Sequence, residues 1–279
     1  EKVNLPSKIT YLGHRLFDGC TILETVNIPE GVTYFDSYVF YGCKKLVSLQ
    51  IPASVQRFGE CCFEGCSSLK TINIPQNVSV LSSNLFKDCI SLMTIELPNT
   101  IKEIGYGCFW MCTALETLDI PQSVEKVGRA ILTGNNLLSI TGKFATPDNK
   151  SLVYNDVLIA AAGGVQDSFT IPQGILSIGE YAFKSSSFET VILNSALQKI
   201  ESYAFNESVV KEISIPAGVI SIGDNAFHDS KLEYITFDGE SQLYELGHSC
   251  FAGSALKAIS IPESVELRKN RAFTACTNL

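Results

Sequence analysis

Apolar and polar residues recur along this chain in blocks of about 23 residues. A proline marks most blocks, and an aromatic residue follows the proline position by eleven residues in most of them. A fixed period of this size predicts stacked supersecondary units, each unable to bury its apolar face alone. We call each unit a rung. The prolines are Pro6, Pro29, Pro52, Pro75, Pro98, Pro121, Pro172, Pro216 and Pro262, and the aromatic residues are Phe17, Phe40, Phe63, Phe86, Phe109, Phe183, Phe205, Phe227 and Phe273.

The residues before each proline predict a short strand. Leu69, Ile72 and Ile74 precede Pro75, and the step from Ile72 to Ile74 has a period of two, which places both side chains on one face. Proline ends the strand because it cannot donate a hydrogen bond to a ladder. Stacking the rungs therefore predicts a parallel sheet built from one short strand per rung.

A second apolar pair follows each proline and usually ends in glycine. Val55 and Phe58 precede Gly59, and glycine holds the equivalent position in most rungs. We predict a backbone turn with positive φ at this glycine. Other residues take its place in some rungs, namely Asp36, Ser82, Glu201 and Lys269.

The rungs fall into two subtypes. Three residues after the phenylalanine, residues 1–141 carry cysteine in rungs of 23 residues, and residues 171–279 mainly carry serine in rungs of about 22 residues. A buried hydroxyl needs a hydrogen-bond partner that a thiol does not. We therefore hypothesise that the shorter turn of the serine rungs supplies that partner.

The period fails once, between Pro121 and Pro172. Within residues 142–170, the apolar segments 152–154 and 157–159 flank Asn155 and Asp156, which predicts a β-hairpin with a two-residue turn. The alternative is a degenerate rung. Neither end of the chain carries the polar cap that terminal repeats usually have, so we expect the chain to be a segment of a longer protein.

The combined pattern resembles the BspA-like leucine-rich repeat family. Residues 213–227, from Ile213 to Phe227, carry the Ile-x-Ile-Pro, Val, Ile-Gly and Phe positions of that family, and the motif covers nearly the whole chain. The resemblance implies a single domain over residues 1–279. It would be a right-handed, mostly β solenoid with a parallel sheet on its concave side, short turns on its convex side and one inserted β-hairpin. It also implies a secreted or cell-surface bacterial protein with a role in adhesion, and it brings no catalytic residues.

Composition and charge disfavour some classes of binding partner. The chain is 46% hydrophobic and 18% charged, so burial is ample, and its net charge of −8 disfavours nucleic acid and anionic membranes. It contains no apolar run of the roughly 18 residues that a membrane span needs, so we expect no membrane insertion of this segment.

The titratable residues predict no reaction centre. Most of the 10 cysteines follow the repeat. Neighbouring rungs about 4.8 Å apart would hold their Cβ atoms beyond the roughly 3.5–4.5 Å that a disulfide prefers, which predicts buried, reduced thiols. The 3 histidines form no set with a nucleophile and an acid. We therefore expect no catalytic residues, no metal and no cofactor.

Two groups of residues are candidates for binding. Thr94, Glu96, Thr117 and Asp119 belong to two outward-facing rows on the predicted sheet. The favoured alternative is that these rows are structural ladders, because threonine pairs and amide pairs stabilise neighbouring strands.

Trp110 and Tyr41 form the second group. They share the position just after the phenylalanine, where charged residues stand in other rungs, so we predict that they are exposed. The alternative is that each ring lies over its own loop.

The sequence thus predicts a non-enzymatic binding or adhesion module, extracellular or at the cell surface, that recognises a host or neighbouring-cell protein or a glycan. The alternative is a passive structural spacer that displays another domain of a longer surface protein.

Overall fold

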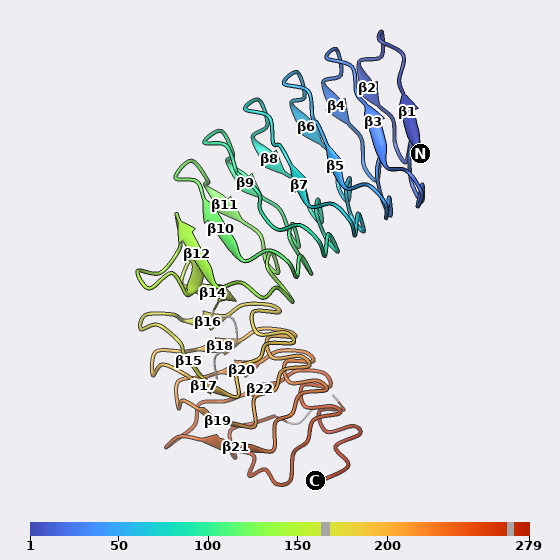
Figure 1. Ribbon diagram of the computed structural model, residues 1–279. Coiled ribbons are helices and arrows are strands. Elements are labelled where there is room, and N and C mark those ends of the chain that lie inside the picture. The colour runs from blue at the N-terminus through green and yellow to red at the C-terminus, as the bar shows by residue number, and fades with distance from the viewer. Residues whose placement is uncertain (163–167, 267–270) are drawn as a thin grey trace. The chain divides into compact units, whose positions relative to one another are not determined.

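The computed structural model describes residues 1–162, 168–266 and 271–279, and these residues form strands and turns without any helix. The chain divides into two compact units, Glu1–Lys150 (unit 1) and Ser151–Leu279 (unit 2). Each unit is a stack of rungs with parallel strands (Figure 1). The predicted repeat solenoid is confirmed, with about eleven turns in the described part of the chain. The described residues contain no apolar helix of membrane-spanning length.

Unit 1 contains two lines of short strands. The strands before the proline position form the proline-side ladder, and those before the glycine position form the glycine-side ladder. Pairing is parallel and in register, with Thr71 opposite Ser48 and Arg57 opposite Tyr34. The proline-side strands are β1 (Lys2–Asn4), β3 (Thr25–Asn27), β5 (Ser48–Leu49), β7 (Thr71–Ile72), β10 (Thr117–Ile120) and β12 (Ser139–Gly142). The glycine-side strands are β2 (Tyr11–Leu12), β4 (Tyr34–Phe35), β6 (Arg57–Phe58), β8 (Val80–Leu81), β9 (Glu103–Ile104) and β11 (Lys126–Val127).

Unit 2 repeats the two ladders. Its proline-side strands form one four-stranded sheet, and its glycine-side strands join the hairpin in a six-stranded sheet. The proline-side strands are β15 (Ser168–Thr170), β17 (Thr190–Ile192), β19 (Glu212–Ile215) and β21 (Tyr234–Phe237). The other sheet contains β13 (Ser151–Tyr154), β14 (Val157–Ala161), β16 (Ser177–Ile178), β18 (Lys199–Ile200), β20 (Ser221–Ile222) and β22 (Glu245–Leu246).

The predicted hairpin is confirmed. Strands β13 and β14 pair antiparallel. Asn155 and Asp156 make the turn with φ of 52° and 60°, the left-handed pair that a two-residue hairpin favours. β14 then pairs parallel with β16, so the hairpin continues the glycine-side ladder of unit 2. Residues 163–167 of the predicted irregular segment lie outside the described residues.

The prediction of positive φ at the repeated glycine is wrong. All seven glycines in this position are described, and none has a positive φ. At most of these glycines the neighbouring rung approaches too closely for a side chain in the glycine's own backbone position. The Gly105 N–H donates to the Leu81 carbonyl at 2.8 Å, and a Cβ on Gly105 would lie 2.7 Å from the Ser83 nitrogen. Lys269, which replaces this glycine in one rung, lies outside the described residues.

Positive φ values occur two residues before and two residues after the phenylalanine position. In one rung these residues are Asn84 and Asp88, with φ of 55° and 60°. The backbone N–H groups of Asn84, Phe86 and Asp88 then donate to carbonyls of the next rung at 2.8–2.9 Å. This third line of bonds between rungs satisfies backbone groups in a segment that the sequence predicted only as a turn.

The phenylalanine positions form the centre of the core. Phe63 stacks between Phe40 and Phe86, with ring centroids 5.6 and 5.5 Å apart. In unit 2 the Phe183, Phe205 and Phe227 rings stack at 4.9 Å. All these rings are buried, so their area stabilises the stack from rung to rung.

The cysteine and serine subtypes differ in hydrogen bonding. The thiol of Cys66 donates to the Phe40 carbonyl of the preceding rung at 3.1 Å, and other cysteines in this position repeat the contact. Ser230 instead donates to the Phe227 carbonyl of its own rung at 2.7 Å. Among the described residues, the buried hydroxyls of Ser186 and Ser208 have no partner. The hypothesis that the short turn supplies a partner is therefore confirmed at Ser230 and wrong at those two serines.

Candidate functional site

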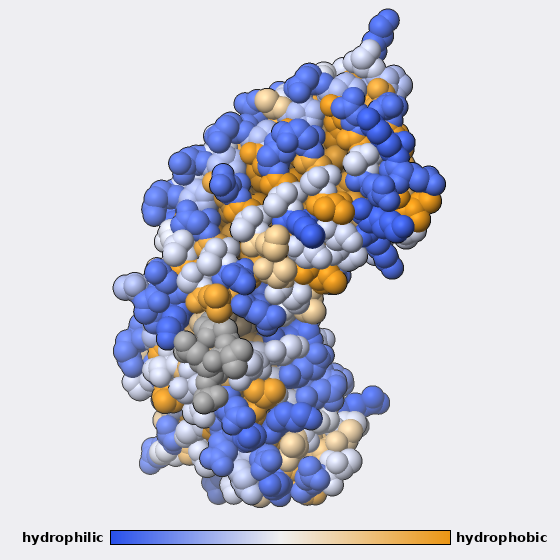
Figure 2. Space-filling view, viewed as in Figure 1, coloured by the Kyte–Doolittle hydropathy of each residue, from blue (hydrophilic) through white to orange (hydrophobic). Residues whose placement is uncertain are grey.

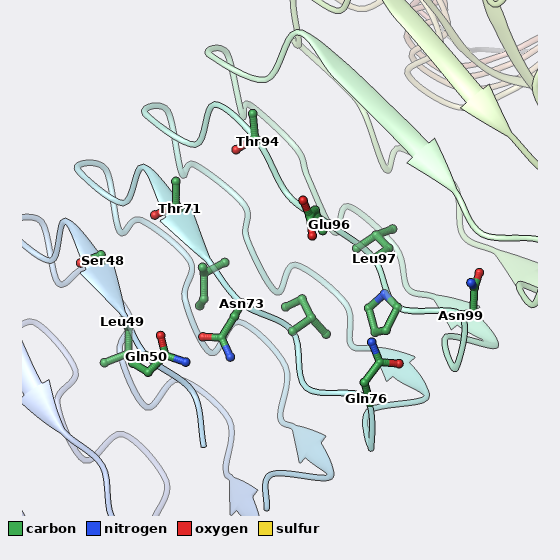
Figure 3. Close-up of a pocket in the computed structure, with 13 residues that line it drawn as sticks. Ser48, Leu49, Gln50, Thr71, Asn73, Gln76, Thr94, Glu96, Leu97 and Asn99 are labelled. Atoms are coloured by element: carbon green, nitrogen blue, oxygen red, sulfur yellow. The ribbon is translucent and has the colours of Figure 1, made fainter. Parts of the chain in front are cut away.

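The outward face of the unit 1 proline-side ladder carries two rows of polar side chains. The first row includes Ser48, Thr71 and Thr94, and the second includes Gln50 and Asn73 (Figure 3). Each of these residues is exposed, whereas the residues between them, such as Ile72, are buried. The alternation follows from the strand period of two, which directs successive side chains to opposite faces.

A groove of about 660 Å³ lies over these rows. We call it the amide groove, because amide and hydroxyl side chains from three successive rungs line it (Figure 3). A second hollow of about 480 Å³ shares Gln50, Asn73 and Gln76 with it, so the hollow surface continues towards β3. The polar lining residues are Ser48, Gln50, Thr71, Asn73, Gln76, Thr94, Glu96 and Asn99, and the apolar ones are Leu49, Ile72, Ile74, Leu97 and Pro98.

Asn73 is a structural member of this lining. Its side-chain amide donates to the Ile51 carbonyl at 2.9 Å, and its oxygen accepts from the Ile51 N–H at 2.8 Å. This two-way contact closes the gap between two rungs just beyond β5 and β7. Asn73 therefore has the structural role that the sequence analysis favoured for its row.

Glu96 occupies the equivalent position one rung later. An ionised carboxylate only accepts hydrogen bonds, so Glu96 cannot make the two-way contact that Asn73 makes. Residues 94–97 form no strand, and the proline-side ladder is interrupted between β7 and β10. The exposed Glu96 side chain lines the groove at this interruption.

The structure places the four sheet candidates in two settings. Thr94 and Glu96 line the amide groove, and Thr117 and Asp119 lie on β10 outside it. Asp119 accepts a hydrogen bond from the Thr141 hydroxyl at 2.5 Å, which links β10 to β12. The lining residues Ser48, Gln50, Asn73 and Gln76 were not singled out from the sequence, because their rows looked uniform.

Tyr41 and Trp110 lie on the turn segments and not in the amide groove. Tyr41 is 36% exposed, and its ring lies 5.6 Å from that of Tyr38. Trp110 is half-buried, with the Tyr106 ring at 6.3 Å and the Lys87 Nζ at 6.0 Å. The two candidates therefore belong to two separate aromatic pairs on the turns of unit 1, and neither lines the amide groove with Glu96.

The buried thiols are held in their protonated form. All ten cysteines are free, and eight of them are buried. Burial raises the pKa of Cys61 to about 11 and that of Cys43 to about 12, so these thiols stay protonated at neutral pH. In the described part of the chain, no three His, Cys, Asp or Glu side chains are placed to hold a metal ion.

Exposed apolar side chains are scattered over unit 1. Val47, Met93 and Leu138 are 46–56% exposed, and each follows the first apolar residue of a rung. Charged residues hold this position in the neighbouring rungs, namely Glu24, Lys70 and Glu116. Figure 2 shows such apolar side chains among polar ones on the face of unit 1 in view. The alternation leaves no large continuous apolar patch from these residues.

Comparison with known proteins assigns the repeat to a known family. The sequence profile described as "BspA type Leucine rich repeat region" matches in 6 copies over residues 1–89, 35–146 and 165–279. No curated protein matches the sequence.

Several solved structures share the fold. A leucine rich cell surface protein from Faecalibacterium prausnitzii is 25% identical, with a TM-score of 0.64 over 100% of this chain and 86% of that one. A leucine-rich repeat protein from Eubacterium ventriosum is 18% identical, with a TM-score of 0.67 over 87% and 80% of the two chains. The pneumococcal vaccine antigen PcpA is 16% identical, with a TM-score of 0.56 over 95% and 82%.

Proposed function

Because the chain belongs to the BspA-type leucine-rich repeat family, we propose that it is a non-enzymatic binding or adhesion module. It acts outside the cell or at a cell surface, where it recognises a protein or a glycan of a host or neighbouring cell. The similar protein from Faecalibacterium prausnitzii is described as a cell surface protein, which supports this location.

The amide groove is the observation that carries the proposal. Its amides and hydroxyls both donate and accept hydrogen bonds, and its Glu96 carboxylate accepts them. Such a lining can pair with sugar hydroxyls or with the backbone of an extended peptide. It contains a single titratable side chain, Glu96, and general acid–base or nucleophilic chemistry requires groups that act together. The groove is therefore suited to holding a ligand and not to transforming one.

A binding screen tests this proposal. The full chain is applied to a glycan array and to a panel of extracellular-matrix proteins, and hits are measured by surface plasmon resonance. We expect Glu96→Gln and Gln50→Ala each to weaken the binding of a true ligand about 10-fold. Glu96→Gln replaces a charged acceptor with a neutral amide, and Gln50→Ala removes an amide from the groove. Glu263→Gln, an exposed glutamate in unit 2, is the matched control and should bind normally.

Two outcomes would count against the proposal. A chain that binds nothing in either panel would favour the passive spacer. A ligand whose binding is lost in Trp110→Ala but retained in Glu96→Gln would place the binding surface on the turn segment around Trp110.

A further inference from the structure

The proline-side face of unit 2 departs from the uniform rows of unit 1. Where unit 1 carries threonine and amide side chains, β17, β19 and β21 present Ile192, Glu212 and Tyr234. Ile192 is 54% exposed and Tyr234 is 44% exposed. Exposed apolar and aromatic side chains on a sheet face mark an interaction surface more often than a structural ladder.

A groove of about 400 Å³ lies over these strands. We call it the tyrosine groove. The ladder register places Glu212 between Thr190 and Tyr234, so its carboxylate stands one strand away from the tyrosine ring. Its outward-facing lining is Thr190, Ile192, Glu212, Ser214, Tyr234, Thr236 and Asp238.

The carboxylates of this groove have no cationic partner within the described residues. The nearby lysines pair elsewhere: Lys211 with Glu189 at 3.1 Å and Lys257 with Glu233 at 2.6 Å. Glu212 and Asp238 are both exposed, and the groove therefore carries two negative charges that a ligand can neutralise.

A series of hydrogen bonds holds the side chains in place at the Asp238 end of the groove. Thr236 donates to the Ser214 hydroxyl at 3.0 Å, and Ser214 donates to Asp238 Oδ1 at 2.5 Å. This leaves Asp238 Oδ2 to accept from a ligand. The near end holds the tyrosine ring, and the Nζ of Lys257 lies 5.3 Å from its centroid. Lys257 therefore already occupies a cation–π position at this ring, and a ligand cation would lie against the ring surface that Lys257 leaves open.

We propose that the tyrosine groove binds an extended protein segment that presents an arginine or lysine side chain. The cation lies against the Tyr234 ring and pairs with Glu212, Ile192 contacts an apolar neighbour of that residue, and Asp238 accepts from the segment further along the groove. Charge complementarity selects this occupant, because a neutral glycan would leave both carboxylates uncompensated. The inference rests on the proposed binding function but concerns a surface separate from the amide groove.

The test uses a phage-displayed library of random heptapeptides selected on the full chain, with counter-selection against the Tyr234→Leu variant. We expect the enriched peptides to share an arginine or lysine. Replacing that arginine with the neutral isostere citrulline, or a lysine with acetyl-lysine, should weaken binding at least 10-fold in isothermal titration calorimetry.

Variants of the chain locate the contact. Glu212→Gln and Tyr234→Leu should each weaken the selected peptide about 10-fold, whereas Tyr234→Phe keeps the aromatic ring and should stay within about 3-fold of the wild type. Glu263→Gln, an exposed glutamate that lines neither groove, should leave the peptide affinity unchanged. The glycan and matrix-protein screen is run separately on the same variants, so a failure of the tyrosine groove is distinguishable from a failure of the proposed function.

Three results would overturn the inference. The first is that no Tyr234-dependent peptide is enriched. The second is that the enriched peptides lack basic residues or bind equally well as citrulline peptides. The third is a glycan-array hit that is lost in Tyr234→Leu, which would make the groove a glycan site.

Discussion

At the scale of the residue, each repeated position is set by the rung beside it. Gly105 is held against its neighbour by a bond from its N–H to the Leu81 carbonyl, and the Ser83 backbone fills the space where a side chain would stand. Its φ is one that any residue adopts. The constraint is therefore a contact between two rungs and not a feature of the local chain.

We expect Gly105→Ala to lower the free energy of unfolding by about 1–3 kcal/mol or more, because the new methyl group overlaps backbone that cannot rotate away. Gly13→Ala is the matched control. Gly13 occupies the same position of the first rung, and a Cβ there would meet nothing nearer than the Tyr11 ring at 3.8 Å. Urea unfolding measures both, and equal losses in the two variants would contradict this explanation.

The residue scale also shows where sequence reasoning stops. Pro75 and Phe63 were identified because their roles depend on residue type and spacing alone. The left-handed Asn84 and the close approach at Gly105 were not, because each follows from backbone of a neighbouring rung more than 20 residues away in the chain. Glycine can be required at a position because the backbone has a positive φ or because there is no space for a side chain, and the sequence alone does not distinguish the two.

At the scale of the element, a single substitution removes a contact between two rungs. Asn73 bonds both backbone groups of Ile51, and the equivalent Glu96 leaves Ile74 without this clamp. The strand pattern before Pro98 is as good as that before Pro75, so the sequence predicted a strand in both rungs. Glu96 can accept but not donate, which accounts for the missing clamp. Asp119 is also only an acceptor and lies within strand β10, so Glu96 alone does not account for the missing strand at residues 94–97.

Glu96→Asn should restore the clamp. We expect it to raise the free energy of unfolding by about 0.5–1.5 kcal/mol, and to slow amide hydrogen exchange at Ile74, whose N–H would gain an acceptor. Glu96→Ala is the control, since it removes the charge without supplying the amide. If Glu96→Ala stabilises the chain equally, the gain comes from the lost charge and the clamp is not its cause.

The candidate site could be predicted only in part from the sequence. Thr94 and Glu96 were found because outward positions follow from the strand period. The groove was not, since it is lined by side chains of three rungs that only the structure brings together. The signal for the tyrosine groove was present in the sequence as a break in two uniform rows, at Ile192, Glu212 and Tyr234, but only the structure shows these side chains lining one hollow.

At the scale of the whole molecule, the two units differ in thiol content. Seven of the eight buried cysteines lie in unit 1, and Cys250 is the one in unit 2. Burial raises the pKa of every one of these thiols, for example that of Cys250 to about 12. Alkaline pH should therefore lower the free energy of unfolding of unit 1 more than that of unit 2. Its buried cysteines are Cys43, Cys61, Cys62, Cys66, Cys89, Cys108 and Cys112.

The direction follows from proton linkage. A thiol with a raised pKa in the folded chain keeps its proton at a pH where the unfolded chain, with a thiol pKa of about 8.5, has lost it. Its full contribution to stability is present below the unfolded pKa and is lost as the pH rises towards the folded pKa. At about pH 9.5 each such thiol lowers the free energy of unfolding by about 1.4 kcal/mol relative to neutral pH.

Urea unfolding under reducing conditions tests the pH dependence of unit 1. Trp110, the only tryptophan, lies in unit 1, so its fluorescence follows that unit. We expect the urea midpoint of the fluorescence transition to fall steeply between pH 7 and about pH 9.5, because seven thiols act in the same direction. Cys66→Val removes one of them and should reduce the pH-dependent loss by about 1.4 kcal/mol. A midpoint that stays constant over this range would mean that the thiols ionise inside the fold, and that the stack of rungs admits water around them.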